Sequence, residues 1–171
     1  MAETVTDKVK QALIAANGLY HRLVLLAGET GSNKTNVLRK IAKDLDTTVI
    51  NLNLALSNEL LDMSAKQRSL RLQGIFRDIA DKNRSPIIFD NLEILFDTDL
   101  KQDPLRLLQD LSRNHTVLAS WSGSFNGQRL IYSETGHSEY RRYETVDALI
   151  VSIDGTATID SVKNNIKAGQ V

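Results

Sequence analysis

The feature that most constrains this chain is a loop that joins an apolar run to a helix-patterned segment. The loop reads Gly28-Glu29-Thr30-Gly31-Ser32-Asn33-Lys34-Thr35, after apolar residues 23–27 and before a helical pattern over 35–45. In such a loop, successive backbone N–H groups point inward, and the helix N-terminus adds its dipole, so together they form an anion-binding concavity. A strand, a glycine-containing loop, Lys-Thr and a helix in this order predict a phosphate-binding loop.

The parts of this loop have separate expected roles. Lys34 would reach the β- and γ-phosphates of a nucleotide, and the Thr35 hydroxyl would ligate Mg²⁺. We expect the nucleotide to contact the whole loop and the first turn of the helix, namely Gly28, Glu29, Thr30, Gly31, Ser32, Asn33, Lys34, Thr35 and Asn36.

One position departs from the pattern G-x-x-x-x-G-K-[ST], because Asn33 stands where the second glycine is expected. Glycine there permits a positive φ and a close approach of backbone to phosphate. Asparagine is among the other residues most tolerant of the left-handed region, so the backbone can keep its shape. Two alternatives stay open: an ordinary strand–turn–helix, and a loop that binds nucleotide weakly or has lost it.

A second informative stretch is the apolar run 87–89, which ends in Asp90 and Asn91. The carboxyl ends of parallel strands face the ligand crevice of an α/β sheet. A carboxylate there can hold Mg²⁺ directly or through water, so Asp90 and Thr35 are the expected metal ligands. The simpler alternative for Asp90 is a turn residue after a strand.

The composition limits the remaining classes. A length of 171 residues suits one domain over 1–171, and 42% hydrophobic with 25% charged residues is typical of a globular protein. Lys+Arg and Asp+Glu are equal at 21 each, which argues against a broad polyanion-binding surface. The absence of cysteine excludes disulfides and thiol catalysis. No apolar run has membrane-spanning length, so we expect a cytoplasmic protein without a membrane partner.

The rest of the chain predicts a β–α alternation. A leading helix is expected within residues 1–18 and a second strand over 47–53. A helix capped by Ser57 should begin near Asn58 and break near residues 63–64. Further strands are expected at 87–90, 116–121 and 148–153.

Two segments do not continue this alternation. Residues 124–144 predict a hairpin insertion with a tight turn around 135–138, and residues 154–171 are a polar tail.

These motifs resemble those of a known superfamily. The loop 28–35 looks like a Walker A motif and Ile87–Asp90 looks like a Walker B motif. Polar Ser120 and Ser122 end the next strand, where related proteins carry a sensor. Over residues 22–153 the chain is similar to the additional-strand division of P-loop NTPases, which includes the AAA+ and STAND ATPases. The resemblance implies an α/β fold with a parallel five-stranded sheet in the order 2-3-4-1-5, flanked by helices. It also implies ATP and Mg²⁺ as ligands. A helical lid is not expected, since the chain ends about where one would begin.

A narrower resemblance rests on the chain length, the missing lid and the segment 136–143, Gly-His-Ser-Glu-Tyr-Arg-Arg-Tyr. These features look like the small P-loop protein of type 3 bacteriophage-exclusion (BREX) defence systems. That resemblance implies protein partners in a phage-defence complex, and a homo-oligomer stays open.

The catalytic residues also depart from the resembled family, whose Walker B aspartate is usually followed by a glutamate that polarises water. Here Asn91 follows Asp90, and the next acid is Glu93. An amide can orient a water but cannot take its proton, so we expect a slow or partner-activated ATPase. The candidate catalytic residues are Lys34, Asn91, Glu93 and Ser120. An arginine supplied in trans could complete the site, with candidates Arg84, Arg113, Arg141 and Arg142.

Other functions stay open beside an ATPase. One is a structural or regulatory adaptor for which nucleotide is dispensable. Another is a DNA-binding component that uses the hairpin 128–144, with Tyr132, His137, Tyr140, Arg141, Arg142 and Tyr143. The competing interpretation of that hairpin is that its tyrosines pack on the sheet edge. No clear Asn-Lys-x-Asp motif for guanine is present, and the choice between ATP and GTP stays open.

Overall fold

The computed structural model describes residues 4–127, 129–133, 140–144 and 146–154. The α-helices are α1 Val5–Ala16, α2 Lys34–Asp44, α3 Leu52–Leu60, α4 Ala65–Asp81 and α5 Pro104–Leu111. Two short 3₁₀ turns are η1 Glu93–Phe96 and η2 Thr98–Leu100. The strands are β1 Leu23–Gly28, β2 Val49–Asn51, β3 Ile87–Asp90, β4 Val117–Phe125, β5 Leu130–Ser133, β6 Tyr140–Tyr143 and β7 Leu149–Ser152.

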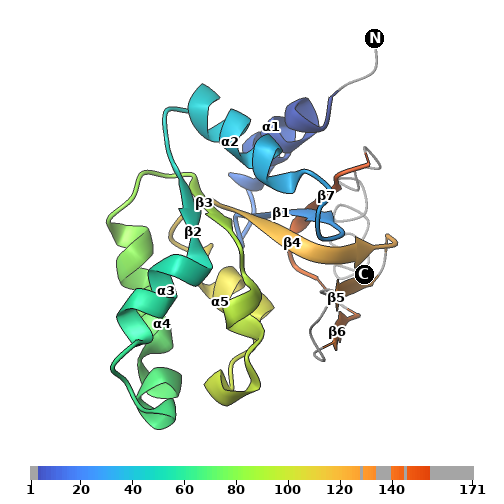
Figure 1. Ribbon diagram of the computed structural model, residues 1–171. Helices are drawn as coiled ribbons and strands as arrows, with labels where there is room; N and C mark the ends of the chain where they lie inside the picture. Colours follow the sequence, from blue (N-terminus) through green and yellow to red (C-terminus); the bar gives the residue numbers. More distant parts are fainter. Residues whose placement is uncertain (1–3, 128, 134–139, 145, 155–171) are drawn as a thin grey trace.

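The central sheet has the strand order β2-β3-β4-β1-β7, and every neighbouring pair along this path is parallel (Figure 1). This confirms the predicted order, because β7 is the fifth strand expected from the sequence. The β5–β6 pair is antiparallel and is joined to β4, as the predicted hairpin insertion requires. Parallel strands all end at one edge, so the loops after β1, β2, β3 and β4 meet there.

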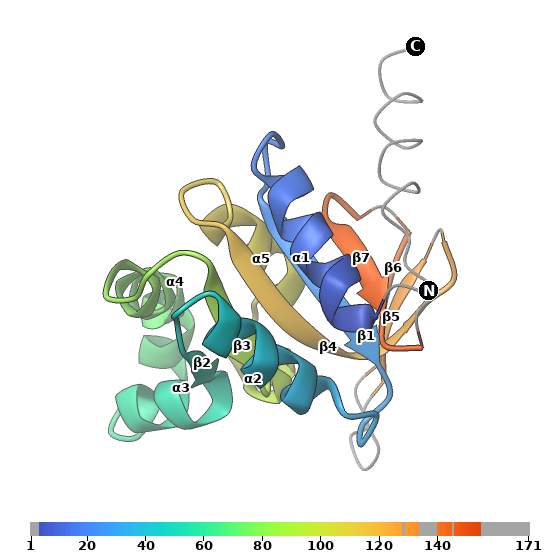
Figure 2. The same ribbon diagram turned by 90° about the horizontal axis from the view of Figure 1, so that it is seen from above.

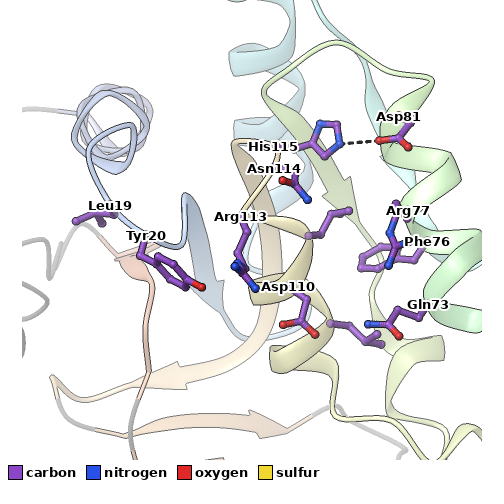
Figure 3. Close-up of a pocket in the computed structure, with 12 residues that line it drawn as sticks. Leu19, Tyr20, Gln73, Phe76, Arg77, Asp81, Asp110, Arg113, Asn114 and His115 are labelled. Carbon is purple, nitrogen blue, oxygen red and sulfur yellow. Dashed lines mark hydrogen bonds and ion pairs between the residues drawn. The ribbon is translucent and has the colours of Figure 1, made fainter.

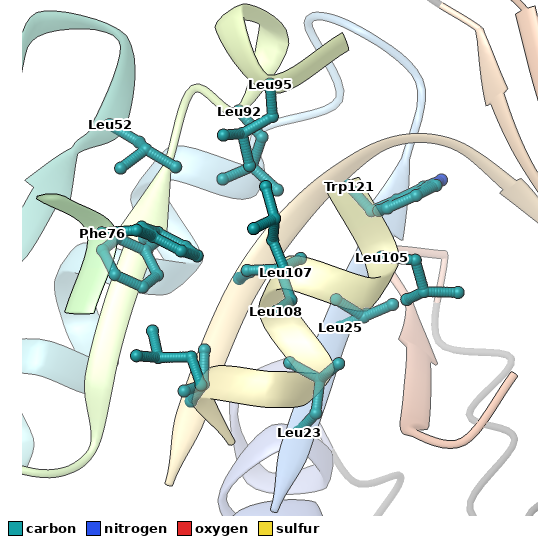
Figure 4. Close-up of a cluster of buried hydrophobic side chains, with 14 of the residues drawn as sticks. Leu23, Leu25, Leu52, Phe76, Leu92, Leu95, Leu105, Leu107, Leu108 and Trp121 are labelled. Carbon is teal, nitrogen blue, oxygen red and sulfur yellow. The ribbon is translucent and has the colours of Figure 1, made fainter. Parts of the chain in front are cut away.

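The two faces of the sheet are covered by different helices (Figure 2). In β1, Val24 and Leu26 pack in a cluster with the apolar residues of α1 and α2. The alternate residues Leu23 and Leu25 belong to the cluster that α3, α4 and α5 complete on the other face (Figure 4). A strand that is buried on both faces is expected to be apolar throughout, as residues 23–27 are. None of the described helices is long and apolar enough to cross a bilayer.

The predicted second strand and the helix after it differ from the structure. The strand β2 ends at Asn51, because the Asn51 side chain accepts a hydrogen bond from the Leu54 N–H at 3.1 Å and so caps α3. Ser57 therefore lies inside α3, and its prediction as a helix cap was wrong. The break near 63–64 is present, since Ser64 caps α4 and forms a capping box with Gln67.

The fourth strand also runs further than predicted, to Phe125 rather than Trp121. Its last residues, from Gly123 to Phe125, pair with β5 in an antiparallel hairpin, and this pairing extends the strand beyond the parallel sheet. The Tyr132 ring stacks on Phe96 with centroids 3.4 Å apart, and the Trp121 Nε1–H donates to the Ile131 carbonyl at 3.1 Å. Tyr132 and Tyr143 of the hairpin thus pack on Phe96 and on Trp121 of the middle strand β4, and not on an edge strand of the sheet. The predicted turn, with His137, and the polar tail from 155 lie outside the described residues.

Candidate nucleotide site

A cavity of about 280 Å³ lies at the carboxyl edge of the sheet, where the segments after β1 and β3 meet Ser120 and Ser122 of β4. It is lined by polar residues from these elements, namely Thr30, Gly31, Ser32, Asn33, Lys34, Thr35, Asp90, Asn91, Glu93, Ser120 and Ser122. Most of the predicted site residues are therefore brought together in one place, although they lie up to 90 positions apart in the chain.

The backbone of the first loop enters the left-handed region at two positions. Gly31 and Asn33 both lie in the left-handed region, with φ of 82° and 75°. The Asn33 conformation is thus the one that glycine would adopt at this position of the motif. Gly28 is required for a different reason, since a Cβ there would lie 2.5 Å from Ser32 Oγ and 2.6 Å from Ile153 Cγ2.

Lys34 is the first residue of α2 and is only 7% exposed. Its ammonium donates to the carbonyl oxygens of Gly28 and Glu29, both at 2.8 Å. A buried ammonium needs hydrogen-bond partners to offset its desolvation, and the loop carbonyls supply them. The positive charge of Lys34 is thereby held in the wall of the cavity.

Asp90 is the centre of the hydrogen bonds in the cavity and is 5% exposed. The Thr35 hydroxyl donates to its Oδ2 and the Ser120 hydroxyl donates to its Oδ1, both at 2.6 Å. The start of α2, the end of β3 and the middle of β4 are thus tied to one carboxylate. Short bonds from hydroxyl groups to a charged acceptor are the strong type, so they fix the carboxylate in place.

The chain turns sharply after Asp90. Asn91 has a φ of 58°, in the left-handed region, and η1 begins two residues later at Glu93. This bend brings Glu93 to the cavity wall beside Asn91. Glu93, a catalytic candidate from the sequence, therefore lines the same cavity as Asp90 and Lys34.

Asn53 is a residue of this site that the sequence analysis did not identify. Its Nδ2 donates to Glu93 Oε2 at 2.7 Å, and its Oδ1 accepts from the Ile94 N–H at 2.8 Å. Its own N–H donates to the Asn91 carbonyl at 3.0 Å. Through these three hydrogen bonds, Asn53 holds the segment that bends after Asp90. A polar residue just after a parallel strand was the available signal.

Some predicted residues lie outside the cavity wall. Gly28 and Glu29 contribute carbonyl groups to Lys34 but do not line the cavity, and Asn36 lies on the exposed side of α2. Ser122, by contrast, lines it from β4.

The four arginines considered for a trans role contact other parts of the described chain: Arg84 contacts Asp46, Arg113 lies over Tyr20, Arg141 contacts Gln102, and Arg142 contacts Glu144.

A larger cavity, of about 920 Å³, lies at the opposite edge of the sheet between α4, α5 and the segment before β1 (Figure 3). Its charged groups include an ion pair between His115 Nε2 and Asp81 Oδ1 at 2.8 Å. The Arg113 guanidinium lies 4.9 Å from the centre of the Tyr20 ring. Each of these contacts has an exposed partner, Asp81 or Arg113, and neither contact joins the ends of two strands.

The parallel sheet, the loop after its central strand and the aspartate at the end of β3 define a P-loop nucleotide-binding domain. The chain belongs to the AAA family, the ATPase family associated with various cellular activities, whose model matches residues 24–118, more than half of the chain. The matched segment runs from β1 into β4 and includes Lys34, Thr35 and Asp90. No solved structure matches the chain.

Proposed function

We propose that this AAA-family chain binds Mg-ATP at the cavity of about 280 Å³ and hydrolyses it slowly unless a partner completes the site. One observation carries the proposal. The Asp90 carboxylate is fixed by two hydroxyl groups beside Lys34, while the position after Asp90 holds an amide instead of a base.

The residues present fit a magnesium nucleotide. Thr35 and Asp90 are oxygen ligands of the type that Mg²⁺ prefers, and they lie in direct contact, at 2.6 Å. In the described part of the chain, no group of three or more His, Cys, Asp or Glu residues could hold a metal alone. This suits Mg²⁺, which is usually held by one or two protein ligands together with phosphate and water. When bound, the ion would neutralise charge on the phosphates.

The proposed slow rate follows from the two carboxylates in the cavity wall. Asp90 is engaged by Thr35 and Ser120, and Glu93 accepts a hydrogen bond from the Asn53 amide at 2.7 Å. Asn91 can orient a water but has no site for its proton. Glu93 is therefore the remaining candidate base, and Asn53 holds one of its oxygens.

A partner could supply what the isolated chain lacks. Phosphoryl transfer depends on charge stabilisation, and an arginine from another subunit can add it. Arg84 is a suitable donor, because it lies at the surface with its side chain 75% exposed. Arg113, Arg141 and Arg142 are the further candidates. The donor chain could be a second copy or another protein.

Calorimetry and single-turnover kinetics test the proposal. ATP and GTP are titrated with and without Mg²⁺, and turnover is then measured on the isolated chain. We expect magnesium-dependent binding and a rate well below the typical enzyme median of about 10 s⁻¹. Unchanged stability and partner binding without nucleotide would instead favour the adaptor function. Fast turnover of the isolated chain would contradict the slow-enzyme proposal.

The hairpin does not favour DNA as the partner. Arg129 and Arg142 both pair with Glu144, each at 2.9 Å, so part of its positive charge is compensated. A place in a phage-defence complex rests only on the narrower resemblance given by the sequence, and residues 136–139 of the segment that carries it lie outside the described chain. It stays a prediction, which co-purification of the chain with its native partners would test.

A further inference from the structure

The altered position of the phosphate-binding loop has a second asparagine beside it. Asn36 is the third residue of α2, one helical turn after Asn33. Its Nδ2 donates a hydrogen bond to Asn33 Oδ1. Residues three apart on a helix are neighbours, so this bond spans the first turn without distorting it.

The Asn33 side chain is not oriented by the helix that it precedes. It occupies the N-cap position of α2 but makes no side-chain capping bond, and its backbone is left-handed with φ 75° and ψ 20°. The residues that cap the other helices do accept such bonds, namely Thr4, Asn51, Ser64 and Asp103. The bond that orients the Asn33 amide is therefore the one from Asn36.

The direction of this bond matters because of the cavity. Both side chains are exposed, but Asn33 lines the cavity and Asn36 does not. The amide end of Asn33 is thus held toward the outer side of α2. Without this contact, the side chain would sample other staggered rotamers about its Cα–Cβ bond. Rotamers that turn its carbonyl oxygen toward the loop would place a partial negative charge near the phosphates.

We infer that Asn36 is a positioning residue for nucleotide binding. By holding the Asn33 amide, it keeps the side chain that replaces glycine out of the phosphate space and favours the left-handed backbone at Asn33. The inference rests on the proposed function and deepens it, since it explains how a loop without the second glycine still accepts phosphate. Asn33 and Asn36 together then take the place of one glycine.

The test is a double-mutant cycle on Mg-ATP affinity, measured by calorimetry with wild type, Asn36→Ala, Asn33→Gly and the double variant. Asn36→Ala should weaken binding about fivefold, the effect of one neutral hydrogen bond. Asn33→Gly should bind as well as wild type or better. In that background Asn36→Ala should have no effect, because the side chain that it holds is gone.

Two controls separate positioning from stability. Alanine has a higher helix propensity than asparagine, so Asn36→Ala should not lower the unfolding temperature. Asn58→Ala, at another exposed helical asparagine, should leave affinity unchanged.

The outcomes separate this inference from the proposed function. If wild type does not bind Mg-ATP, both are overturned. If wild type binds and Asn36→Ala binds equally well, the inference alone is overturned. An equal loss in both backgrounds would also overturn it, since Asn36 would then contact the nucleotide directly.

Discussion

The two edges of the sheet carry polar cavities of very different size and construction. The cavity at the carboxyl edge has about 280 Å³, and the one at the opposite edge has about 920 Å³. In the smaller one, Asp90 accepts hydrogen bonds from residues 55 positions before it and 30 positions after it, at 2.6 Å. In the larger one, the ion pair of His115 with Asp81 has a half-exposed acid.

The two cavities differ in how deeply their polar groups are buried and in how firmly other elements hold them. Lys34, Asp90 and Ser120 are all less than a tenth exposed, and their placement is fixed by several elements at once. Such groups are costly to bury, and they are arranged around a space that can receive a charged ligand. The larger cavity is bounded by long surface side chains, such as Arg77 and Arg113, that water already solvates (Figure 3). The convergence of buried polar groups, and not volume, is therefore the basis on which we propose the carboxyl edge as the nucleotide site.

The largest expected effect is at Lys34. Lys34→Ala should weaken Mg-ATP binding more than about 100-fold, because a charge-assisted contact to phosphate is lost from the cavity wall. Lys43→Ala, an exposed lysine of the same helix, is the matched control and should bind as wild type does. Circular dichroism should show that both variants fold. Equal calorimetric affinities for Lys34→Ala and wild type would remove the assignment of this edge as the nucleotide site.

The next largest effect should come from Asp90. Asp90→Ala should remove the magnesium-dependent part of ATP binding, a loss of at least about tenfold, because a carboxylate is the strongest metal ligand in the cavity. It also releases the Thr35 and Ser120 hydroxyls, so a lower unfolding temperature is expected. Asp62→Ala, at an exposed acid, is the control. Magnesium dependence that survives in Asp90→Ala would mean that another group holds the ion.

The residues of the smaller cavity differ in how far the sequence could predict them. The loop 28–35 and Asp90 were predictable, because their chemistry depends on neighbours in the chain and on the direction of parallel strands. The strand order was predictable for the same reason. Even the left-handed Asn33 was expected from the tolerance of asparagine for that region.

Asn53 was not predicted, and the reason is physical. The β-branched pattern favoured a strand through 47–53, which makes Asn53 an ordinary strand residue. In the structure Asn51 caps a helix from Leu52, so Asn53 lies on the first turn of α3 and reaches Glu93. A short polar side chain such as that of Asn51 can end a strand and cap a helix. The spacing of apolar residues does not reveal this. The extension of β4 was missed because it depends on pairing with β5.

A third prediction concerns Glu93, the acid that the bend of the chain after Asp90 brings to the cavity wall. Glu93→Gln should lower whatever turnover the isolated chain has, because its carboxylate is the candidate base, while affinity for Mg-ATP should change little. Asn91→Glu should raise turnover if water activation alone is limiting. Single-turnover hydrolysis on the three proteins separates these effects. Turnover that Glu93→Gln leaves unchanged would remove Glu93 from the mechanism.

The smallest expected effect is that of a substitution in the larger cavity, at the opposite edge of the sheet. His115→Gln removes the ion pair with Asp81, whose carboxylate is 55% exposed. Solvent screens such a pair, so the free energy of unfolding should fall by less than about 1 kcal/mol. The proposed nucleotide site shares no hydrogen bond with this pair in the described chain, and Mg-ATP affinity and turnover should therefore equal those of wild type. Chemical denaturation and calorimetry on the same preparation measure both quantities. A loss of nucleotide affinity without a loss of stability would show that the two cavities are coupled. Burial and convergence of polar groups would then not suffice to tell the nucleotide site from the larger cavity.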